Sequence, residues 1–174
     1  SYQGNTYLTD GNLLITHQNH LGEGGIYFQG GELAIFENGI VDKQLFLEKE
    51  AKITIPTHTK VTWKGPFQGK GSLRKKGLGK LTLKGEKTLP ASSTLFIQEG
   101  TLCIDSETSD FPCPIAFLDG TFETIKPLIL SEKIQVRKKA IFSSKKESSI
   151  YINHPIKGIG DVEKTGEGSI TFAK

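Results

Sequence analysis

The chain lacks the features that mark several common classes of protein. It has two cysteines, Cys103 and Cys113, and no second Cys or His pair at ligand spacing accompanies them, which argues against a zinc site. A disulfide between them stays open, because an oxidising compartment would allow it and a reducing one would not. No apolar run approaches the roughly 18–20 residues that span a bilayer. No segment keeps the i, i+3, i+4, i+7 spacing of a helix over a dozen residues, and the start of the chain shows no signal-peptide pattern.

Arginine is nearly absent as well, since Arg74 and Arg137 are the two arginines of the chain and the other basic residues are lysines. Charged residues make up 24% of the 174 residues and the net charge is +3, so the composition does not indicate disorder. This length suffices for one domain with a continuous core.

The chain is rich in glycine and contains an internal repeat. Residues 11–85 align with residues 100–174 at a constant offset of 89, without a gap. Identical residues fall at Gly11, Leu13, Ile15, Ile26, Phe28, Gly31, Lys49, Ala51, Pro66, Gly69, Gly71, Lys75, Gly77, Gly79 and Thr82 of the first copy. Such repeats indicate a solenoid, in which each unit buries its apolar face against its neighbours. We divide the chain into repeat one (1–88) and repeat two (89–174). Because Lys174 aligns with Gly85 in mid-repeat, we expect a fragment of a longer array.

Apolar residues two positions apart recur along the chain, which predicts short strands with one buried face. Several of these pairs follow one another at a step of 20 residues, as do Leu13, Leu33, Ile53 and Leu73, and also Val61 and Leu81. The chain is therefore predicted to be an all-β parallel β-helix with coils of about 20 residues, in which these side chains form columns. A β-sandwich is the alternative, but its hairpins would not by themselves produce a recurring step of 20.

A glycine cluster is the most patterned segment and occurs once in each repeat. Gly69–Leu83 and Gly158–Phe172 both follow G-x-G-x-[LV]-x-K-x-G-x-G-x-[LI]-T-[LF]. The pattern predicts a turn, a strand, a second turn and a second strand, with glycines where one coil bends into the next. We expect Leu73 and Leu81 to point inward and Lys75 to lie outside or at a corner.

This pattern resembles the passenger-associated transport repeat, or autotransporter-associated β-strand repeat, of bacterial autotransporters. The resemblance extends to Gly100-Thr101-Leu102, to residues 5–13 and to residues 21–33, which are similar to the family's LGxG…GGxL continuation; Phe111-Pro-Cys-Pro departs from it. The resemblance implies a right-handed β-helical passenger that is secreted across the outer membrane and displayed at the bacterial surface. It also implies a translocator barrel C-terminal to this segment.

Two groups of cations could suggest a polyanion partner. The first comprises Lys70, Arg74, Lys75, Lys76 and Lys80, whereas the same stretch of repeat two carries Asp161, Glu163 and Glu167. Because the charge inverts while the glycines persist, we interpret this stretch as a solvated face and predict no nucleic-acid partner. A Walker loop is excluded, since Gly79-Lys80 is followed by Leu81. The second group, Arg137–Lys139 with Lys145 and Lys146, could attract acidic glycans.

Candidates for catalysis are few. Asp10 and Glu99 stand at equivalent places before a glycine, where turn formation is a better interpretation than acid–base chemistry. The four histidines are His17, His20, His58 and His154, and none pairs with another across the repeat. We therefore predict no catalytic, metal or cofactor-binding residue and no enzyme activity.

Aromatic residues divide by strand parity. Phe28, Trp63, Phe117 and Phe172 are expected to point inward, whereas Tyr2, Tyr7, Tyr27 and Tyr151 are candidates for exposure. Three of these tyrosines along one face would be needed to suggest a strip for glycan binding.

The function predicted from the repeat and the resemblance is a structural stalk or spacer of a secreted, surface-displayed autotransporter passenger, without membrane insertion by this segment. The alternative is an adhesin module that binds host glycan or protein, or another copy of itself, through the loops Thr16–Glu23 and Asp105–Pro114. A β-helical polysaccharide-degrading enzyme is a further alternative, which three acidic side chains converging in a groove would favour.

Overall fold

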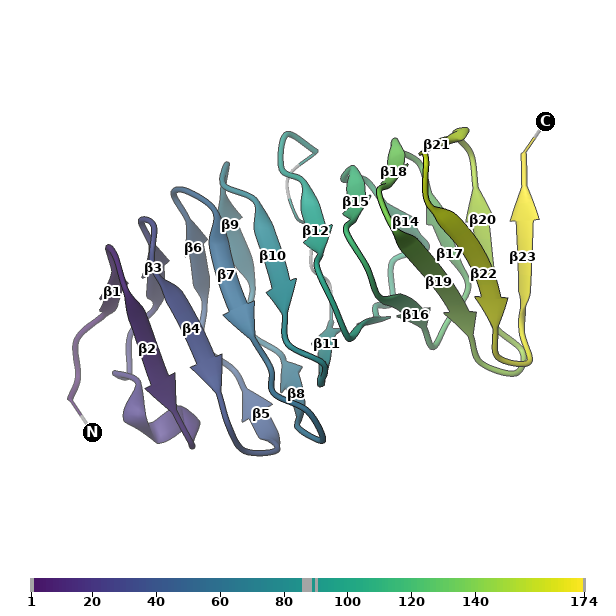
Figure 1. Cartoon of the computed structure of the whole chain (residues 1–174). Coiled ribbons are helices and arrows are strands. Elements are labelled where there is room, and N and C mark those ends of the chain that lie inside the picture. The colour runs from purple at the N-terminus through teal and green to yellow at the C-terminus, as the bar shows by residue number, and fades with distance from the viewer. Residues whose placement is uncertain (1, 86–88, 90, 174) are drawn as a thin grey trace.

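The computed structural model describes residues 2–85, 89 and 91–173. The end of repeat one at residue 88 and the alignment of Lys174 therefore lie outside the described residues. In the described part the chain is an all-β solenoid without α-helix, and one 3-10 turn, η1 (Gln18–His20), is present. As the chain advances from left to right in Figure 1, the strands nearest the viewer at the left run down and those behind run up. The coil is therefore right-handed, and the predicted right-handed parallel β-helix is confirmed.

Three faces enclose the core, and every strand pairing is parallel. Sheet A comprises β1 (Thr6–Leu8), β3 (Ile26–Phe28), β6 (Leu45–Leu47) and β9 (Phe67–Gly69). Sheet B comprises β2 (Asn12–Ile15), β4 (Glu32–Ile35), β7 (Ala51–Thr54), β10 (Leu73–Lys76), β12 (Leu95–Ile97), β15 (Ile115–Phe117), β18 (Ile134–Val136) and β21 (Ile156–Gly158). Sheet C comprises β5 (Gly39–Val41), β8 (Lys60–Trp63), β11 (Lys80–Lys84), β13 (Thr101–Asp105), β16 (Thr121–Thr124), β19 (Lys139–Ser144) and β22 (Asp161–Thr165). Sheet D comprises β14 (Asp110–Phe111), β17 (Leu128–Leu130), β20 (Ser149–Ile152) and β23 (Ser169–Phe172), and takes the place of sheet A in the second half.

Side chains of equal register stack in columns along the axis. Leu13, Leu33 and Ile53 are register partners on sheet B, as are Val61 and Leu81 on sheet C. All of these except Leu13 are fully buried. The columns predicted from the 20-residue step are thus confirmed for these five residues.

The fourth member of the first column was predicted wrongly. Ile53 pairs with Lys75, whereas Leu73 pairs with Ala51. The cause lies in the corner between β7 and β8, which spans residues 55–59, whereas the corner between β4 and β5 spans only residues 36–38. Two additional residues in that corner lengthen the coil and move the register by two.

Aligned residues of the two sequence repeats do not lie on the same face of the solenoid. Leu13 lies on sheet B and its identical counterpart Leu102 lies on sheet C; Ala51 and Ala140 are related in the same way. Following the register from Leu13 through four coils leads to Ile97, and Leu102 lies one corner further along the chain. The offset of 89 residues therefore corresponds to four coils and one face.

Inward aromatic residues form part of the core, and Phe28, Trp63 and Phe117 are fully buried as predicted. The prediction for Phe172 was wrong, because its side chain is 58% exposed. Phe172 lies on β23, which has a neighbouring strand on one side only, so no further coil covers it. Within the described part of the chain, no helix has the length and apolar character needed to cross a bilayer.

Candidate functional site

Lys75 is the most unusual buried group of the solenoid. The sequence predicted it outside or at a corner, but its side chain is fully buried in the inward column of sheet B, between Ile53 and Ile97. Its ammonium group donates hydrogen bonds to the carbonyl oxygens of Lys76 (2.9 Å), Gly77 and Glu99 (3.1 Å). These three acceptors use all three N–H donors of the ammonium group, which is what makes its burial tolerable.

The surroundings of Lys75 shift its titration. Burial lowers the pKa of Lys75 from 10.5 to about 8, and the Glu99 carboxylate opposes this shift. The same Glu99 side chain accepts a hydrogen bond of 3.1 Å from the backbone N–H of Gly77. Gly77 has a φ of 76°, a conformation that favours glycine, and so brings its carbonyl and its N–H within reach of both partners. Lys75, Gly77 and Glu99 therefore join two successive corners. We name these three residues the lysine corner.

The second copy of the motif reproduces the local part of this arrangement. Lys164 also donates to the carbonyl of the glycine two residues on, Gly166, whose φ is 77°. Lys164 is exposed, because β22 lies at the end of sheet C and no coil covers it. The hydrogen bond from the lysine to the glycine two residues on therefore occurs in both copies of the K-x-G pattern. The bond from Lys75 to Glu99 requires the following coil.

Two pairs of outward charges in the first half join different coils. Lys76 on β10 reaches Glu32 on β4 at 2.6 Å and so spans three coils, and Arg74 binds Glu50 through two hydrogen bonds of 3.0 and 2.8 Å. Burial raises the pKa of Glu32, but the hydrogen bonds from Lys76 and Thr54 outweigh it and leave the pKa below its usual value. The bond from Arg74 lowers the pKa of Glu50. The solvated face expected at Arg74 and Lys76 is therefore a set of cross-coil pairs.

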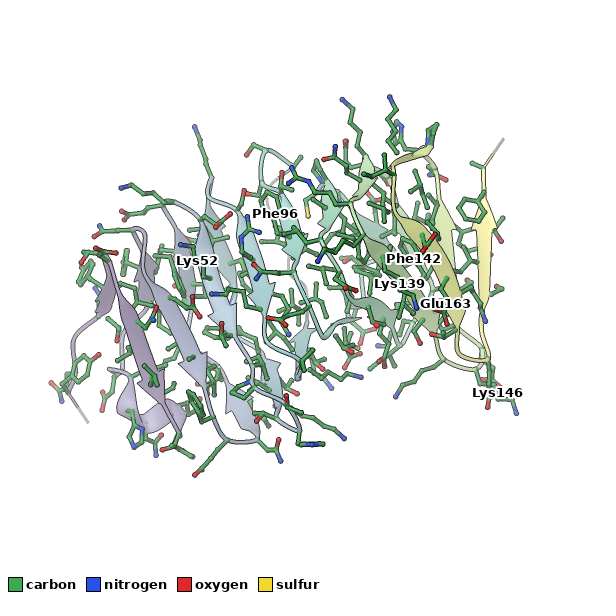
Figure 2. All side chains as sticks on the ribbon, in the orientation of Figure 1. Lys52, Phe96, Lys139, Phe142, Lys146 and Glu163 are labelled. Atoms are coloured by element: carbon green, nitrogen blue, oxygen red, sulfur yellow. The ribbon has the colours of Figure 1, made fainter. Side chains whose placement is uncertain are left out.

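The second predicted cluster of cations is divided by the fold. Lys139 begins β19 and is paired with Glu163 at 2.6 Å, whereas Lys145 and Lys146 follow the other end of that strand. Figure 2 shows Lys139 beside Glu163 and Lys146 apart from them at a corner. The hydrogen bond from Lys139 to Glu163 raises the pKa of Lys139. The structure therefore does not bring Arg137–Lys139 and Lys145–Lys146 together.

Three aromatic residues follow one another on the outer side of sheet A. Tyr7, Tyr27 and Phe46 are register partners, with ring centroids 4.8 and 4.2 Å apart and nearly parallel planes. Of the tyrosines expected to be exposed, Tyr2, Tyr7 and Tyr151 are, whereas Tyr27 is half-buried. Because the rings stack on one another, the column offers mainly ring edges and hydroxyl groups to a ligand, and its faces stabilise the sheet instead.

Three open grooves on the surface are each lined by two acidic residues. Glu23 and Asp42 line a groove of about 410 Å³, Glu123 and Glu167 one of about 560 Å³, and Glu99 and Asp119 one of about 290 Å³. None of these grooves, as lined by described residues, contains the three acidic side chains that would favour a glycan-degrading enzyme. Asp10 accepts a hydrogen bond from the N–H of the following Gly11, as expected of a turn residue, whereas Glu99 accepts from Gly77 in the preceding coil.

The two loops singled out in the sequence enclose little space. The void beside residues 16–18 measures about 20 Å³ and the one beside residues 106–111 about 10 Å³, room for about one water molecule each. Cys103 and Cys113 are buried free thiols, and burial raises their pKa values to about 11 and about 12. Among the described residues, no group of three or more His, Cys, Asp or Glu side chains could hold a metal ion.

No family model matches this chain, and comparison with curated proteins and with solved structures finds no similar protein. The fold places this chain in the class of parallel β-solenoids. The buried lysine corner is the most distinctive internal feature of this chain.

Proposed function

We propose that this chain is a rigid spacer segment of a secreted, surface-displayed bacterial protein of the autotransporter type, and not an enzyme. One observation supports this most directly: parallel ladders and inward columns continue through eight strands of sheet B without interruption. At about 4.8 Å per coil, seven steps give a rod about 34 Å long. A rod whose described coils are joined by continuous parallel strand pairing keeps whatever lies beyond it at a set distance.

The outer faces support the same proposal. Lys80 on β11 pairs with Glu123 on β16 at 2.7 Å and crosses the intervening strand β13, as Lys76 and Glu32 do on sheet B. Each such pair contributes on the order of 0.2–1 kcal/mol, so several of them stiffen the rod without dominating its stability.

Folding of a solenoid suits a chain that leaves the cell unfolded. Strand pairing joins each coil only to its immediate neighbours, so structure can spread coil by coil without a long-range closing step. The lysine corner is consistent with this order, because Lys75 has its own Gly77 carbonyl in reach first and gains the Glu99 carbonyl when the next coil arrives.

The location is tested by adding an external protease to intact bacteria that make the parent protein. We expect the segment to be reachable from outside, measured by loss of antibody signal from intact cells, while a periplasmic marker protein stays whole. Reactivity that appears only after lysis would contradict surface display.

The spacer itself is tested by hydrogen exchange. We expect the slowest amides in the central strands β10, β11 and β13 and the fastest in β1 and β23. Refolding followed by pulse labelling is expected to show protection spreading from one end. Equal protection gained everywhere at once would contradict folding coil by coil.

An adhesin module is the second candidate function. The observation that favours it is a group of exposed cations near the C-terminal end of sheet B that have no ion-pair partner among the described residues.

A further inference from the structure

Four cations gather around β18 and β21 on the outer side of sheet B. Lys133 precedes β18, Arg137 and Lys138 follow it, and Lys157 is the middle residue of β21. All four side chains are exposed, and none takes part in an ion pair within the described chain. We name these residues the basic shelf.

The register of the sheet sets their arrangement. Ile134 and Val136 are buried, so Gln135 points outward, and Lys157 is its register partner on the neighbouring strand. Ladder hydrogen bonds continue past both ends of β18, since the Lys133 carbonyl accepts from Ile115 and the Arg137 N–H donates to Phe117. The backbone is therefore extended from Lys133 to Arg137, which places these two residues about 13 Å apart on the same side as Gln135.

The groups beside the shelf form no ion pair with its cations within the described chain. Next to Gln135 on β15 lies Ala116, which is too small to form a wall. Glu132 is half-buried and close enough to Cys113 to act on the pKa of that thiol. Asp119 lines a groove together with Lys138, so Lys138 marks the edge of the shelf.

We propose that the basic shelf binds a linear anionic glycan, one that carries sulfate or uronate groups along its chain. Three cations around a central amide match such a ligand, because the cations attract the acidic groups and Gln135 can donate to and accept from sugar hydroxyls. The proposal deepens the adhesin candidate and rests on it, whereas the spacer function does not depend on it.

Other polyanions fit the shelf less well. Single-stranded nucleic acid is held by aromatic platforms beside the cations, but Phe96, the outward aromatic residue of sheet B, lies two strands away and is covered by the Arg74 guanidinium at 4.3 Å. An anionic membrane needs an apolar face that enters the bilayer, and Ile159, 96% exposed, is the large apolar side chain beside the shelf. One such residue makes a weak anchor.

The test is titration of the folded chain with a heparin decasaccharide and with oligogalacturonate, with cellohexaose as the neutral probe. The variant Lys133→Gln/Arg137→Gln/Lys157→Gln is expected to lose at least tenfold in affinity for an acidic probe and to show a shallower salt dependence. The matched control Lys60→Gln/Lys64→Gln/Lys70→Gln removes the same charge at exposed positions elsewhere and is expected to change affinity less than twofold.

Three outcomes would overturn the proposal: equal losses in the two triple variants, no measurable binding of either acidic probe, or equally tight binding of cellohexaose. Tighter binding of a 20-nucleotide oligothymidylate, or of vesicles with 30% phosphatidylglycerol, would also overturn it in favour of another partner. Circular dichroism and the thermal midpoint of each variant show that the fold is intact. An intact fold with no glycan binding refutes the shelf and leaves the spacer function standing.

Discussion

The ammonium group of Lys75 and the backbone carbonyl of Glu99 form a hydrogen bond of 3.1 Å that joins one coil to the next. A second bond of equal length runs in the same direction, from the Gly77 N–H to the Glu99 carboxylate. A lone buried cation is costly in an apolar core, and it is retained here because three carbonyl oxygens surround it. Its arrangement leads to the first two predictions.

Replacing Lys75 with alanine is expected to lower the free energy of unfolding by about 2–4 kcal/mol, because the substitution leaves a cavity and removes the donor for three carbonyls. The control is Lys164→Ala, which alters the same motif at an exposed position and is expected to cost less than about 0.5 kcal/mol. Urea denaturation monitored by tryptophan fluorescence measures both. Similar losses in the two variants would show that the bond to Glu99 contributes nothing.

Alkaline pH is expected to stabilise the fold through Lys75. Its pKa is about 8 in the folded chain and near 10.5 when unfolded. Below pH 8 both states carry the proton and the folded state bears the full penalty. Between pH 8 and 10.5 the unfolded chain binds more protons, so the free energy of unfolding rises with pH by up to about 3 kcal/mol.

The measurement is the difference in unfolding free energy between the natural chain and Lys75→Met at several pH values from 7 to 10.5. The difference is expected to shift in favour of the natural chain as pH rises. Parallel curves would show that the pKa of Lys75 is not lowered.

Gly71 is expected to tolerate no side chain. A Cβ atom there would lie 1.8 Å from the carbonyl oxygen of Lys49 in the preceding coil, so Gly71→Ala must push two corners apart. We expect a loss of about 2–4 kcal/mol. Gly39→Ala is the control, because nothing lies within 4 Å of its Cβ position, and its effect is expected to stay within about 0.5 kcal/mol. Thermal unfolding of the two variants decides the matter.

Both cysteines are expected to be unreactive in the folded chain. Cys103 and Cys113 are buried, and pKa values of about 11 and about 12 leave almost no thiolate at pH 8. Iodoacetamide should modify them only in denaturant, and reduction should leave the intact mass unchanged. Ser92→Cys, at an exposed turn, serves as a reactive control. A mass increase of two hydrogens on reduction would reveal a disulfide instead.

Much of the fold could be predicted from local patterns. Apolar residues two positions apart identified strands such as Leu45–Leu47 and Ile134–Val136. The first and last residues of both strands are buried. The step of 20 residues placed Leu13, Leu33 and Ile53 in one column. These predictions succeeded because strand parity and a regular coil length are properties of the chain itself.

The candidate sites could be predicted much less well, because corner length controls which residues meet. Two extra residues at positions 55–59 put Lys75 rather than Leu73 in the column. Coil length also set Lys157 beside Gln135, which is 22 residues earlier in the chain, and so assembled the basic shelf. The sequence pointed to Arg137 but not to Lys133 or Lys157, since no local pattern joins them.

The sequence by itself determined that this chain is a parallel solenoid with glycine corners, because period, parity and turn residues act over a few positions. Only the tertiary structure decided that Leu13 and Leu102, identical and aligned, lie on different faces. It also decided which charges are paired and which stand free. The reason is geometric. The number of residues in a coil depends on the lengths of its corners, and these lengths vary. Which residues meet between coils therefore depends on the lengths of all the corners that separate them.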